Sequence, residues 1–381
     1  MRLLLSAGEV SGDQHGAALL GALSERVPGL EAFGLAGDRC AALGMRLLAH
    51  QKELAIIGVV EAFGKIRFAH RLIRDLTREA VASKADAAVL IDSPDFHLPL
   101  ARRLAKAGVP VVFYVSPQVW AWRSGRARTL ARLGRGVLTL FRFEKRWYDA
   151  RSLGERVTWV GHPLVDEARR ELETPAAPPA PGRRRVVLMP GSRAGEVRNL
   201  LPILRDAVAL LESRRCDLDV VLVKADSVPD DLLRRVAGPS LDRWSVVSGP
   251  HLSLLAASDV LLVASGTATV EGLLAGVPMV VVYKVAALSY LLGRLLVKVP
   301  NVAMANILSD PGDGSRAVPE LIQGAATPER VAGEVERFLD DPKRADEARR
   351  RLAAGREELG EPGAPGRTAE AILSLLGRSA S

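Results

Sequence analysis

The sequence predicts an α/β protein of two Rossmann-like, doubly wound parallel-sheet domains, and three observations lead to this prediction. Short, continuous apolar runs alternate with helical patterns along most of the chain, as in parallel sheets that are covered on both faces. The 381 residues give room for two such domains. A proline-rich, basic stretch at Thr174–Arg185, reading TPAAPPAPGRRR, interrupts the alternation near the middle of the chain.

The first half of the chain contains six runs with the character of buried strands. The first, Leu3–Ala7, is followed by a short turn and a helical pattern over Gln14–Arg26. Helical patterns separate most of the later runs too, which favours parallel pairing. The other five expected strands are Leu30–Gly34, Ala87–Ile91, Val109–Tyr114, Gly136–Leu140 and Thr158–Val160.

The same alternation resumes after the proline-rich stretch. The expected strands are Val186–Met189, Val220–Val223, Trp244–Val247, Val260–Val263 and Val280–Tyr283, and the expected helices are Leu200–Arg214, Asp230–Val236 and Thr269–Ala275. From Pro328 onward the pattern is helical, with a Gly/Pro break at Gly360–Gly366.

These patterns predict an N-terminal domain over 1–170, a linker over 171–185 and a C-terminal domain over 186–355. The remaining residues, 356–381, form a helical tail that is free to pack back on the N-terminal domain. Ligands of such sheets bind at the carboxyl ends of the strands. We therefore expect two sets of strand ends to face each other across a cleft.

Composition narrows the class of protein. The net charge of +8 and the pI near 9.8 predict a basic face, which would suit an anionic small molecule, an anionic membrane or nucleic acid. Cys40 and Cys216 lie far apart, so neither a disulfide framework nor a cysteine metal site is indicated. The apolar run at the N-terminus is too short for a signal peptide. Polar or charged residues interrupt every window of about twenty residues, so no membrane-spanning helix is expected. A cytoplasmic protein is expected, with peripheral membrane contact left open.

In the second half, Val260–Pro278 is typical of a strand, a turn and a helix. Small and hydroxylated residues at Ser265, Gly266, Thr267 and Ala268 would let a phosphate approach the amino end of the helix. Glu271, one turn later, has a carboxylate that suits the vicinal hydroxyls of a ribose or another sugar. An ordinary capped helix is the alternative interpretation.

A second strand-to-turn element precedes the helix that begins this half. Gly191 permits close backbone approach, and Arg193 offers a planar fork for phosphate oxygens, with Ser192 between them and Glu196 following. Alone, this is an ordinary proline-glycine turn with a surface arginine. Two such turns in one domain favour a nucleotide.

In the first half, acidic residues follow two strands. Asp92, Asp95 and His97 come after Ala87–Ile91 and are candidate general bases, the alternative being an Asx-type turn that caps a helix. Glu9, Ser11, Gly12 and Asp13 follow Leu3–Ala7. Their acidity would repel phosphate, which favours sugar hydroxyls or an acceptor, and GEVSGD lacks the spacing of a dinucleotide site.

A polar and aromatic segment, Tyr114–Arg123, follows another strand. Ser116, Gln118 and Trp120 are candidates for contacting a sugar, although tryptophan is more often core packing. His162 follows the last strand of this half, but one histidine is no metal site.

A basic amphipathic helix is expected within Gly58–Arg78. Phe63 and Ile66 are apolar, while Arg67 and Arg71 are basic, a combination that suits a membrane interface. A surface helix whose arginines cover a core stripe is the alternative. The apolar segment Ala286–Lys298 is similarly ambiguous.

Six motifs occur in one order: GEVSGD, IDSPDF, YVSPQVWAWR, GHPLVD, LMPGSRAGEV and SGTATVEGLLAGVPMVV. With them the chain resembles the lipid-A-disaccharide synthase family of glycosyltransferases, as far as Val318-Pro319-Glu320. The resemblance implies a GT-B fold and an inverting reaction without metal or cofactor. It would transfer 2,3-diacylglucosamine from UDP-2,3-diacylglucosamine to 2,3-diacylglucosamine 1-phosphate, giving a β-1′,6-linked disaccharide.

The resemblance also assigns roles to matching positions. Asp95 matches the proposed general base, and Glu9 and Asp92 match acidic positions near it. UDP-sugar would contact Gly191, Ser192, Arg193, Glu196, Ser265, Gly266, Thr267, Ala268, Glu271 and Asn306. The acceptor would contact Ser11, Gly12, Asp13, Ser116, Gln118 and Trp120, and the inner-leaflet surface would contact Phe63, Ile66, Arg67 and Arg71.

One flank departs from the family pattern. Asn306 is retained, but it lies in Ala305–Asp310, where the family has a preceding proline and a following Ala-Gly. Other readings stay open: another GT-B activity on a UDP-N-acetylglucosamine-type sugar, such as a 2-epimerase or an N-acetylglucosaminyltransferase, or a non-catalytic nucleotide-sugar-binding protein at a membrane surface. Only net charge supports nucleic acid, so no nucleic-acid partner is expected. The oligomeric state is open.

Overall fold

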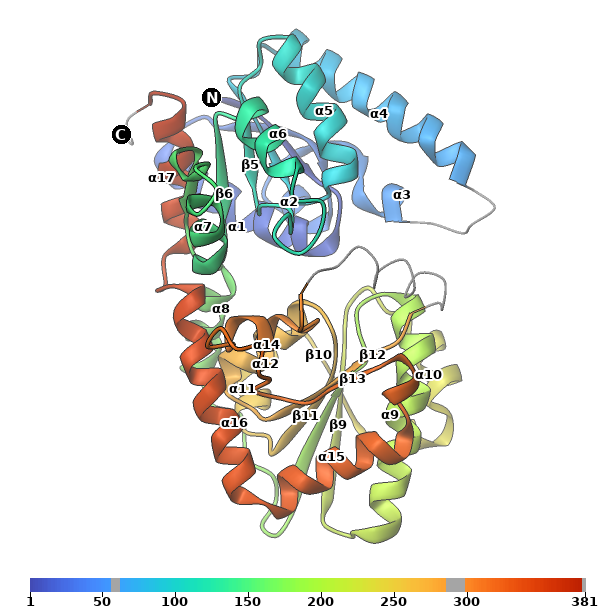
Figure 1. Ribbon diagram of the computed structural model, residues 1–381. Helices are drawn as coiled ribbons and strands as arrows, with labels where there is room; N and C mark the ends of the chain where they lie inside the picture. Colours follow the sequence, from blue (N-terminus) through green and yellow to red (C-terminus); the bar gives the residue numbers. More distant parts are fainter. Residues whose placement is uncertain (56–61, 286–298, 379–381) are drawn as a thin grey trace. The chain divides into compact units, whose positions relative to one another are not determined.

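The computed structural model describes residues 1–55, 62–285 and 299–378 (Figure 1). The chain forms two compact units. The N-terminal unit comprises Met1–Pro163 together with Leu359–Ser381, and the C-terminal unit comprises Leu164–Glu358. The chain therefore leaves the N-terminal unit after Pro163 and returns to it at Leu359.

The N-terminal unit is built on a seven-stranded sheet in the order β3-β2-β1-β4-β5-β6-β7, and every pair is parallel. The strands are β1 (Arg2–Ala7), β2 (Glu31–Ala36), β3 (Arg46–His50), β4 (Ala87–Ile91), β5 (Val111–Tyr114), β6 (Gly136–Thr139) and β7 (Val157–Trp159). Because all strands run the same way, their carboxyl ends share one edge of the sheet.

The helices of this unit are α1 (Val10–Arg26), α2 (Asp38–Ala42), α3 (Gln51–Ala55), α4 (Ala62–Ala82), α5 (Pro94–Lys106), α6 (Arg126–Leu133), α7 (Arg142–Asp149) and α17 (Ala364–Leu375). One core joins alternate sheet residues, such as Leu4, Leu90 and Phe113, to apolar residues of α4, α5 and α6, among them Leu76 and Leu104. On the other side α1 lies beside α17, where Arg26 binds Glu370.

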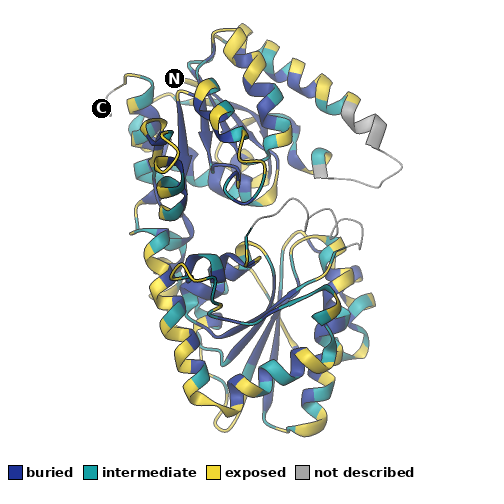
Figure 2. Cartoon of the chain, viewed as in Figure 1, coloured by how far each residue is buried: buried dark blue, intermediate teal, exposed yellow. Residues whose placement is uncertain are grey.

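The C-terminal unit repeats this plan with six parallel strands in the order β10-β9-β8-β11-β12-β13. They are β8 (Arg184–Met189), β9 (Leu218–Lys224), β10 (Ser245–Ser248), β11 (Val260–Ala264), β12 (Met279–Tyr283) and β13 (Glu320–Ile322). The central strands are almost wholly apolar and buried, as Figure 2 shows in dark blue, because helices cover both faces of the sheet.

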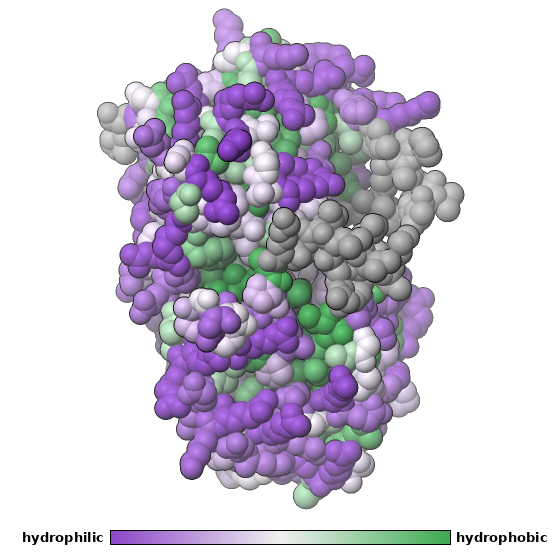
Figure 3. Space-filling view, in the orientation of Figure 1, coloured by the Kyte–Doolittle hydropathy of each residue, from purple (hydrophilic) through white to green (hydrophobic). Residues whose placement is uncertain are grey.

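Its helices are α8 (Leu164–Leu172), α9 (Ala194–Arg214), α10 (Asp230–Ala237), α11 (Leu252–Ala256), α12 (Thr267–Ala275), α14 (Met304–Leu308), α15 (Pro328–Asp340) and α16 (Pro342–Gly355). Helices α9 and α15 pack together, whereas α12 packs with α8, α11, α14 and α16. The outward faces of α15 and α16 are strongly hydrophilic, as the lower part of Figure 3 shows.

The prediction of two doubly wound domains is confirmed, with differences at element ends and at two strands. Helix α1 begins at Val10 rather than Gln14, and α9 begins at Ala194 rather than Leu200, so both helices start directly after their turns. The strands β3 and β13 were not expected; each is a short edge strand with charged or polar residues, which weakens its apolar signal.

The division between units falls at Pro163, not within 171–185. Helix α8 belongs to the C-terminal unit because it packs on α11 and α12, and its Glu171 accepts a hydrogen bond from Leu252 N at 2.7 Å. The proline-rich stretch is then a loop between α8 and β8. Arg185, at the start of β8, binds the carbonyl of Ala177 in that loop at 2.8 Å.

Over the described residues, no helix combines the length and the apolar character that crossing a bilayer requires. Within the same residues, no cluster of three or more His, Cys, Asp and Glu side chains is arranged to hold a metal ion.

Candidate active site

Each sheet has one point where the chain reverses its direction of winding, and the candidate residues follow the strands at that point. In the N-terminal unit it lies between β1 and β4, whose last residues, Ala7 and Ile91, pair with each other. In the C-terminal unit it lies between β8 and β11, where Met189 pairs with Val263. Ligands of doubly wound sheets bind at such points.

The turn after β4 is held in an uncommon backbone conformation. Asp92 and Ser93 both have positive φ angles, of 52° and 43°. Ser93 also lies against the turn after β1, because a Cβ atom on Gly8 would stand only 2.6 Å from its Oγ. Strained backbone of this kind persists where the surrounding structure fixes it, which is common at functional sites.

His97 is buried and fixes this turn by hydrogen bonds, so it is not an exposed base. Its Nδ1 lies 2.6 Å from the carbonyl oxygen of Asp92, and its Nε2 lies 2.8 Å from Ser6 Oγ. Burial lowers the pKa of His97 to about 4, so the ring is neutral and donates one hydrogen bond while accepting the other. The interpretation of this imidazole as a candidate general base is therefore wrong, since both nitrogens are occupied inside the protein.

Asp95, in the first turn of α5, is the exposed carboxylate of this turn, with 68% of its side chain accessible. Its Oδ1 accepts hydrogen bonds from Arg126 Nη2 at 2.5 Å and Arg123 Nη1 at 3.3 Å. Both guanidiniums also lie over the ring of Trp122, with Cζ at 5.6 and 4.6 Å from its centroid. The sequence did not indicate these partners.

The turn after β1 divides into an exposed part and an internal part. Glu9, which precedes α1, is exposed and Ser11 is half-buried. Asp13 is buried, and its carboxylate accepts backbone N–H groups from Gly37 at 2.8 Å, Arg39 at 3.0 Å and Cys40 at 3.2 Å. Asp13 thereby caps α2 and is held by these hydrogen bonds inside the unit.

Gly12 likewise serves packing. A Cβ atom there would lie 3.3 Å from that of Ala7 and 3.6 Å from Ile91, so the glycine lets α1 approach the strands closely. Of the four candidates in this turn, Glu9 and, partly, Ser11 thus face solvent.

Three candidates follow β5, and they differ in exposure. Gln118 is exposed, whereas Ser116 is buried and its Oγ lies 2.9 Å from the hydroxyl of Tyr148. Trp120 is half-buried and packs edge-on against Phe143, with 4.9 Å between ring centroids. Its indole Nε1 donates a hydrogen bond to Glu144 Oε1 at 3.2 Å.

Glu144 is a notable side chain that the sequence analysis missed. It is buried at the amino end of α7, where Oε2 accepts the backbone N–H of Phe141 at 3.3 Å. Burial raises its pKa to about 8, and the nearby negative charge of Asp92 adds to the shift. Its position three residues after the helix cap lets its carboxylate accept that N–H, but Phe141 has no side-chain oxygen, so the sequence lacks the signature of a capping box that could have identified it.

In the C-terminal unit, the turn after β8 presents the amino end of α9. Gly191 has a φ of 113°, and Ser192 and Arg193 are exposed. Glu196 caps the helix: its Oε2 accepts the N–H groups of Ser192 at 3.0 Å and Arg193 at 3.3 Å, and its Oε1 lies 3.5 Å from Arg193 Nη1. A carboxylate therefore already neutralises this helix end.

The turn after β11 presents the amino end of α12. Gly266 and Thr267 are exposed, while Ser265 and Ala268 are half-buried. Ser265 Oγ donates to the carbonyl of Val302, in the loop before α14, at 3.4 Å. Thr269 Oγ1, in α12, accepts the N–H of Ala305, in α14, at 3.4 Å. With no carboxylate within its first turn, this helix end keeps its positive character.

Glu271 lies one turn into α12 and is paired with His251, which sits at 3.4 Å. Burial alone would lower the pKa of His251, but the carboxylate of Glu271, the carbonyl of Gly249 and the charge of Glu171 together outweigh it and raise the pKa to about 9. The imidazolium is thus positioned to orient Glu271.

Asn306 is fully buried and its amide is used inside the protein. Nδ2 donates to the carbonyl of Val318 and to Glu320 Oε1, both at 2.9 Å, while Oδ1 accepts the N–H of Val318 at 3.0 Å. Glu320 also accepts the N–H groups of Val302 and Ala303. In this arrangement Asn306 shapes the loop that borders the α12 turn through hydrogen bonds made within the protein.

The residues expected to contact a membrane lie in α4. Arg67 and Arg71 are exposed, but Leu72, Ile73 and Leu76 are buried in the core, so this half of the helix covers the sheet. The side chains of Phe63 and Ile66 lie outside the described residues, as does the segment 286–298.

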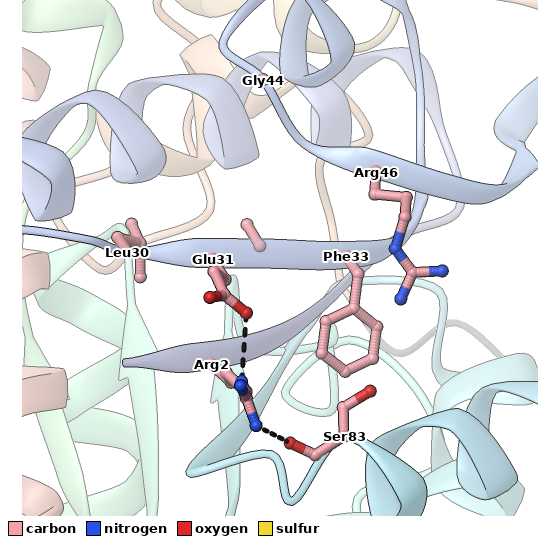
Figure 4. A pocket seen from close by; sticks show the side chains of 8 residues that line it. Arg2, Leu30, Glu31, Phe33, Gly44, Arg46 and Ser83 are labelled. Atoms are coloured by element: carbon pink, nitrogen blue, oxygen red, sulfur yellow. Dashed lines mark hydrogen bonds and ion pairs between the residues drawn. The ribbon is translucent and has the colours of Figure 1, made fainter.

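A shallow pocket lies at the opposite edge of the N-terminal sheet, by the amino ends of β1 and β2 (Figure 4). Its charged lining is paired internally: Arg2 binds Glu31 at 3.0 Å and the carbonyl of Ser83 at 3.1 Å. It is remote from the strand ends that carry the candidate residues.

Comparison with known proteins adds to this geometry. The model of a family described as lipid-A-disaccharide synthetase matches residues 3–368. A lipid-A-disaccharide synthase of Syntrophus aciditrophicus is 39% identical over 382 residues, covering 99% of this chain and 98% of the relative. That of Myxococcus xanthus is 40% identical over 380 residues, covering 98% and 97%.

Solved structures resemble the chain at low sequence identity. A putative UDP-N-acetylglucosamine 2-epimerase from Listeria monocytogenes gives a TM-score of 0.63 at 13% identity, covering 98% of this chain and 96% of that one. The calicheamicin glycosyltransferase CalG4 gives 0.62 at 16% identity, covering 100% and 99%. These similarities show the fold alone, the GT-B fold of glycosyltransferases and epimerases.

Proposed function

The chain belongs to the lipid-A-disaccharide synthase family, and from that premise we propose its substrates and mechanism. It is a glycosyltransferase that forms a lipid A disaccharide. The proposed donor is UDP-2,3-diacylglucosamine and the proposed acceptor is 2,3-diacylglucosamine 1-phosphate. The products are the β-1′,6-linked disaccharide 1-phosphate and UDP.

The observation that carries the proposal is the position of Asp95. It is an exposed carboxylate at the carboxyl edge of the N-terminal sheet, in a turn whose strained backbone is locked by His97. A general base needs this combination of access to substrate and fixed placement. Asp95 would take the proton of the acceptor 6-hydroxyl.

The proposed transfer is a single displacement with inversion. The 6-hydroxyl oxygen bonds to the anomeric carbon of the donor while the bond from that carbon to the β-phosphate oxygen breaks. The hydroxyl proton goes to Asp95, and the bonding electrons leave with UDP. Glu9 and Asp92, in the same pair of turns, would contact the sugar hydroxyls.

The C-terminal unit would bind the donor and stabilise the leaving UDP. The turn Ser265–Ala268 offers backbone N–H groups at the amino end of α12, and Arg193 adds a guanidinium at the neighbouring turn. Donors fixed in this way stabilise developing negative charge without reorganisation. Glu271, oriented by His251, would accept the ribose hydroxyls.

The first test is a direct assay of the reaction. Purified protein is incubated with UDP-2,3-diacylglucosamine, with and without 2,3-diacylglucosamine 1-phosphate, and UDP and lipid products are followed by mass spectrometry. We expect the disaccharide only when both are present. UDP release without disaccharide, or no turnover with UDP still bound, would contradict the proposed acceptor or donor.

The base role gives a second, sharper outcome. Asp95→Asn keeps the size of the side chain but removes its basicity, so we expect transfer to fall by about 100-fold or more. Donor affinity, measured by calorimetry, should stay near that of the wild type. Glu25→Gln, which alters an exposed carboxylate elsewhere on the same unit, is the matched control. Unimpaired transfer by Asp95→Asn would remove it from the base role.

Both proposed lipids are anchored in a membrane, so the enzyme must work at its surface. We place it in the cytoplasm, associated peripherally with the cytoplasmic face of the inner membrane. Exposed Arg67 and Arg71 on α4 support this placement, because basic residues are attracted to anionic lipid headgroups.

A further inference from the structure

The candidate base, Asp95, is paired with two arginines. Oδ1 of Asp95 accepts hydrogen bonds from two guanidiniums, those of Arg126 at 2.5 Å and Arg123 at 3.3 Å. Two positive charges thus face one negative charge. These charge-assisted hydrogen bonds direct Oδ1 at the two arginines, so a substrate hydroxyl must compete with them for this oxygen.

The two arginines are held by more than the carboxylate. Their Cζ atoms lie 4.6 Å (Arg123) and 5.6 Å (Arg126) from the ring centroid of Trp122, within the range of cation–π attraction. Arg123 also has a φ of 52°, a conformation that its surroundings must maintain. Arg126 is 22% exposed against 68% for Asp95. The carboxylate is therefore the partner more open to displacement.

Paired guanidiniums on an aromatic support suit a phosphate. Arginine forks match phosphate oxygens, and a dianion would balance both positive charges where a single carboxylate cannot. The adjoining turns carry Glu9 and Asp92, which would repel a phosphate. On the acceptor, the 6-hydroxyl and the 1-phosphate flank one sugar ring, so the groups that serve them must be neighbours.

We propose that Arg123 and Arg126 bind the 1-phosphate of the acceptor and that this binding releases Asp95 to act on the 6-hydroxyl. The inference rests on the proposed function and deepens it. Until the acceptor binds, the arginines occupy Oδ1 of the base.

Kinetics with two acceptors test the proposal. Rates are measured with 2,3-diacylglucosamine 1-phosphate and with 2,3-diacylglucosamine, for wild type, Arg123→Ala, Arg126→Ala and the control Arg128→Ala, an exposed arginine of the same helix. We expect Arg126→Ala and Arg123→Ala to lose about 10- to 100-fold in kcat/KM for the phosphorylated acceptor. With the other acceptor they should equal or exceed the wild type, and Arg128→Ala should match it throughout.

Trp122 supplies a readout that does not need turnover. Because both guanidiniums lie over its ring, binding of a phosphate dianion to them should change its fluorescence when the phosphorylated acceptor is titrated in. The change should be absent with the unphosphorylated acceptor, in Trp122→Phe and in Arg126→Ala, provided that the last variant binds UDP as the wild type does and so is folded.

Either of two results would overturn the proposal. Arg126→Ala could lose the same fraction of kcat/KM with both acceptors, or it could keep the wild-type kcat/KM for the phosphorylated acceptor. Either can occur while the wild type makes disaccharide. Failure of the wild type to make disaccharide would instead overturn the proposed function.

Discussion

At the scale of single residues, Glu144 shows how much an environment can change a side chain. Its carboxyl group is buried between Trp120 Nε1 and the backbone N–H of Phe141, close to the negative charge of Asp92. Those two hydrogen bonds favour the ionised form, yet desolvation outweighs them and raises the pKa to about 8. Glu144 is therefore largely protonated at neutral pH and holds the indole of Trp120 without adding charge.

This shift predicts a pH dependence of stability. Glu144 keeps its proton in the folded state up to about pH 8 but loses it near pH 4.5 when unfolded, so the folded state binds more protons between these values. Stability from this group is present below pH 4.5 and is lost as the pH rises to about 8, at up to about 1.4 kcal/mol per pH unit.

Glu144→Gln should remove this loss. We expect its urea midpoint to gain on that of the wild type as the pH rises from 5 to 8. Buried His15 and His97, whose pKa values burial lowers to about 4, destabilise both proteins below pH 6.5 and cancel in the difference. Parallel midpoints across this range would show that Glu144 is ionised in the folded state.

The sequence predicted which turns carry polar residues better than it predicted where their side chains point. Asp95 and Arg193 lie exposed at strand ends, as expected. Asp13 and Asn306 lie in the expected turns too, but they bind backbone groups of α2 and of Val318. Those partners are distant or unremarkable in sequence, so residue type and spacing could not reveal them.

At the scale of elements, the two helix ends at the C-terminal switch point differ in charge. The amino end of α9 is capped by Glu196, whereas α12 has no acidic residue in its first turn. A diphosphate is thus favoured at α12 by the helix alone, while at α9 it depends on Arg193 to offset Glu196.

This difference predicts the effect of Arg193→Ala. We expect UDP affinity to fall by about 10- to 100-fold, the loss of one or two charge-assisted hydrogen bonds, in calorimetric titrations with UDP itself. Arg235→Ala, which removes an exposed arginine of α10 in the same unit, should leave the affinity unchanged. An unaltered Kd for Arg193→Ala would exclude this side chain from diphosphate binding.

The elements themselves followed from the sequence where they are long and apolar. The central strands β4 and β11 lie within a residue of their expected bounds, because strands buried on both faces need continuous apolar runs. The edge strands β3 and β13 were missed, since half-exposed strands of five and three residues carry little signal.

At the scale of the whole molecule, the order of the elements along the chain does not show which unit each element belongs to. Helix α17 follows the entire C-terminal unit in sequence yet belongs to the N-terminal unit, where Arg367 binds the carbonyl of Val160 and Arg378 pairs with Asp86. Composition marked the proline-rich stretch as a boundary. The boundary lies at Pro163 instead, because α8 packs against helices of the C-terminal unit, and amino-acid composition does not reveal such tertiary contacts.

The last prediction concerns how the molecule meets its lipid substrates. Within α4, Leu72, Ile73 and Leu76 are buried in the core, whereas Arg67 and Arg71 are exposed. Phe63 and Ile66 remain candidates for membrane contact from the sequence pattern alone. Because each basic residue near an anionic surface contributes about 1 kcal/mol, Arg67→Gln with Arg71→Gln should weaken binding to anionic liposomes by about thirtyfold. Phe63→Ser with Ile66→Ser should weaken binding to neutral liposomes as well, through lost apolar burial.

Neither pair should alter turnover of detergent-dispersed substrate. Arg102→Gln with Arg103→Gln, on exposed positions of α5, is the charge-matched control, and equal partitioning of all variants in sedimentation assays would rule out α4 as the docking element.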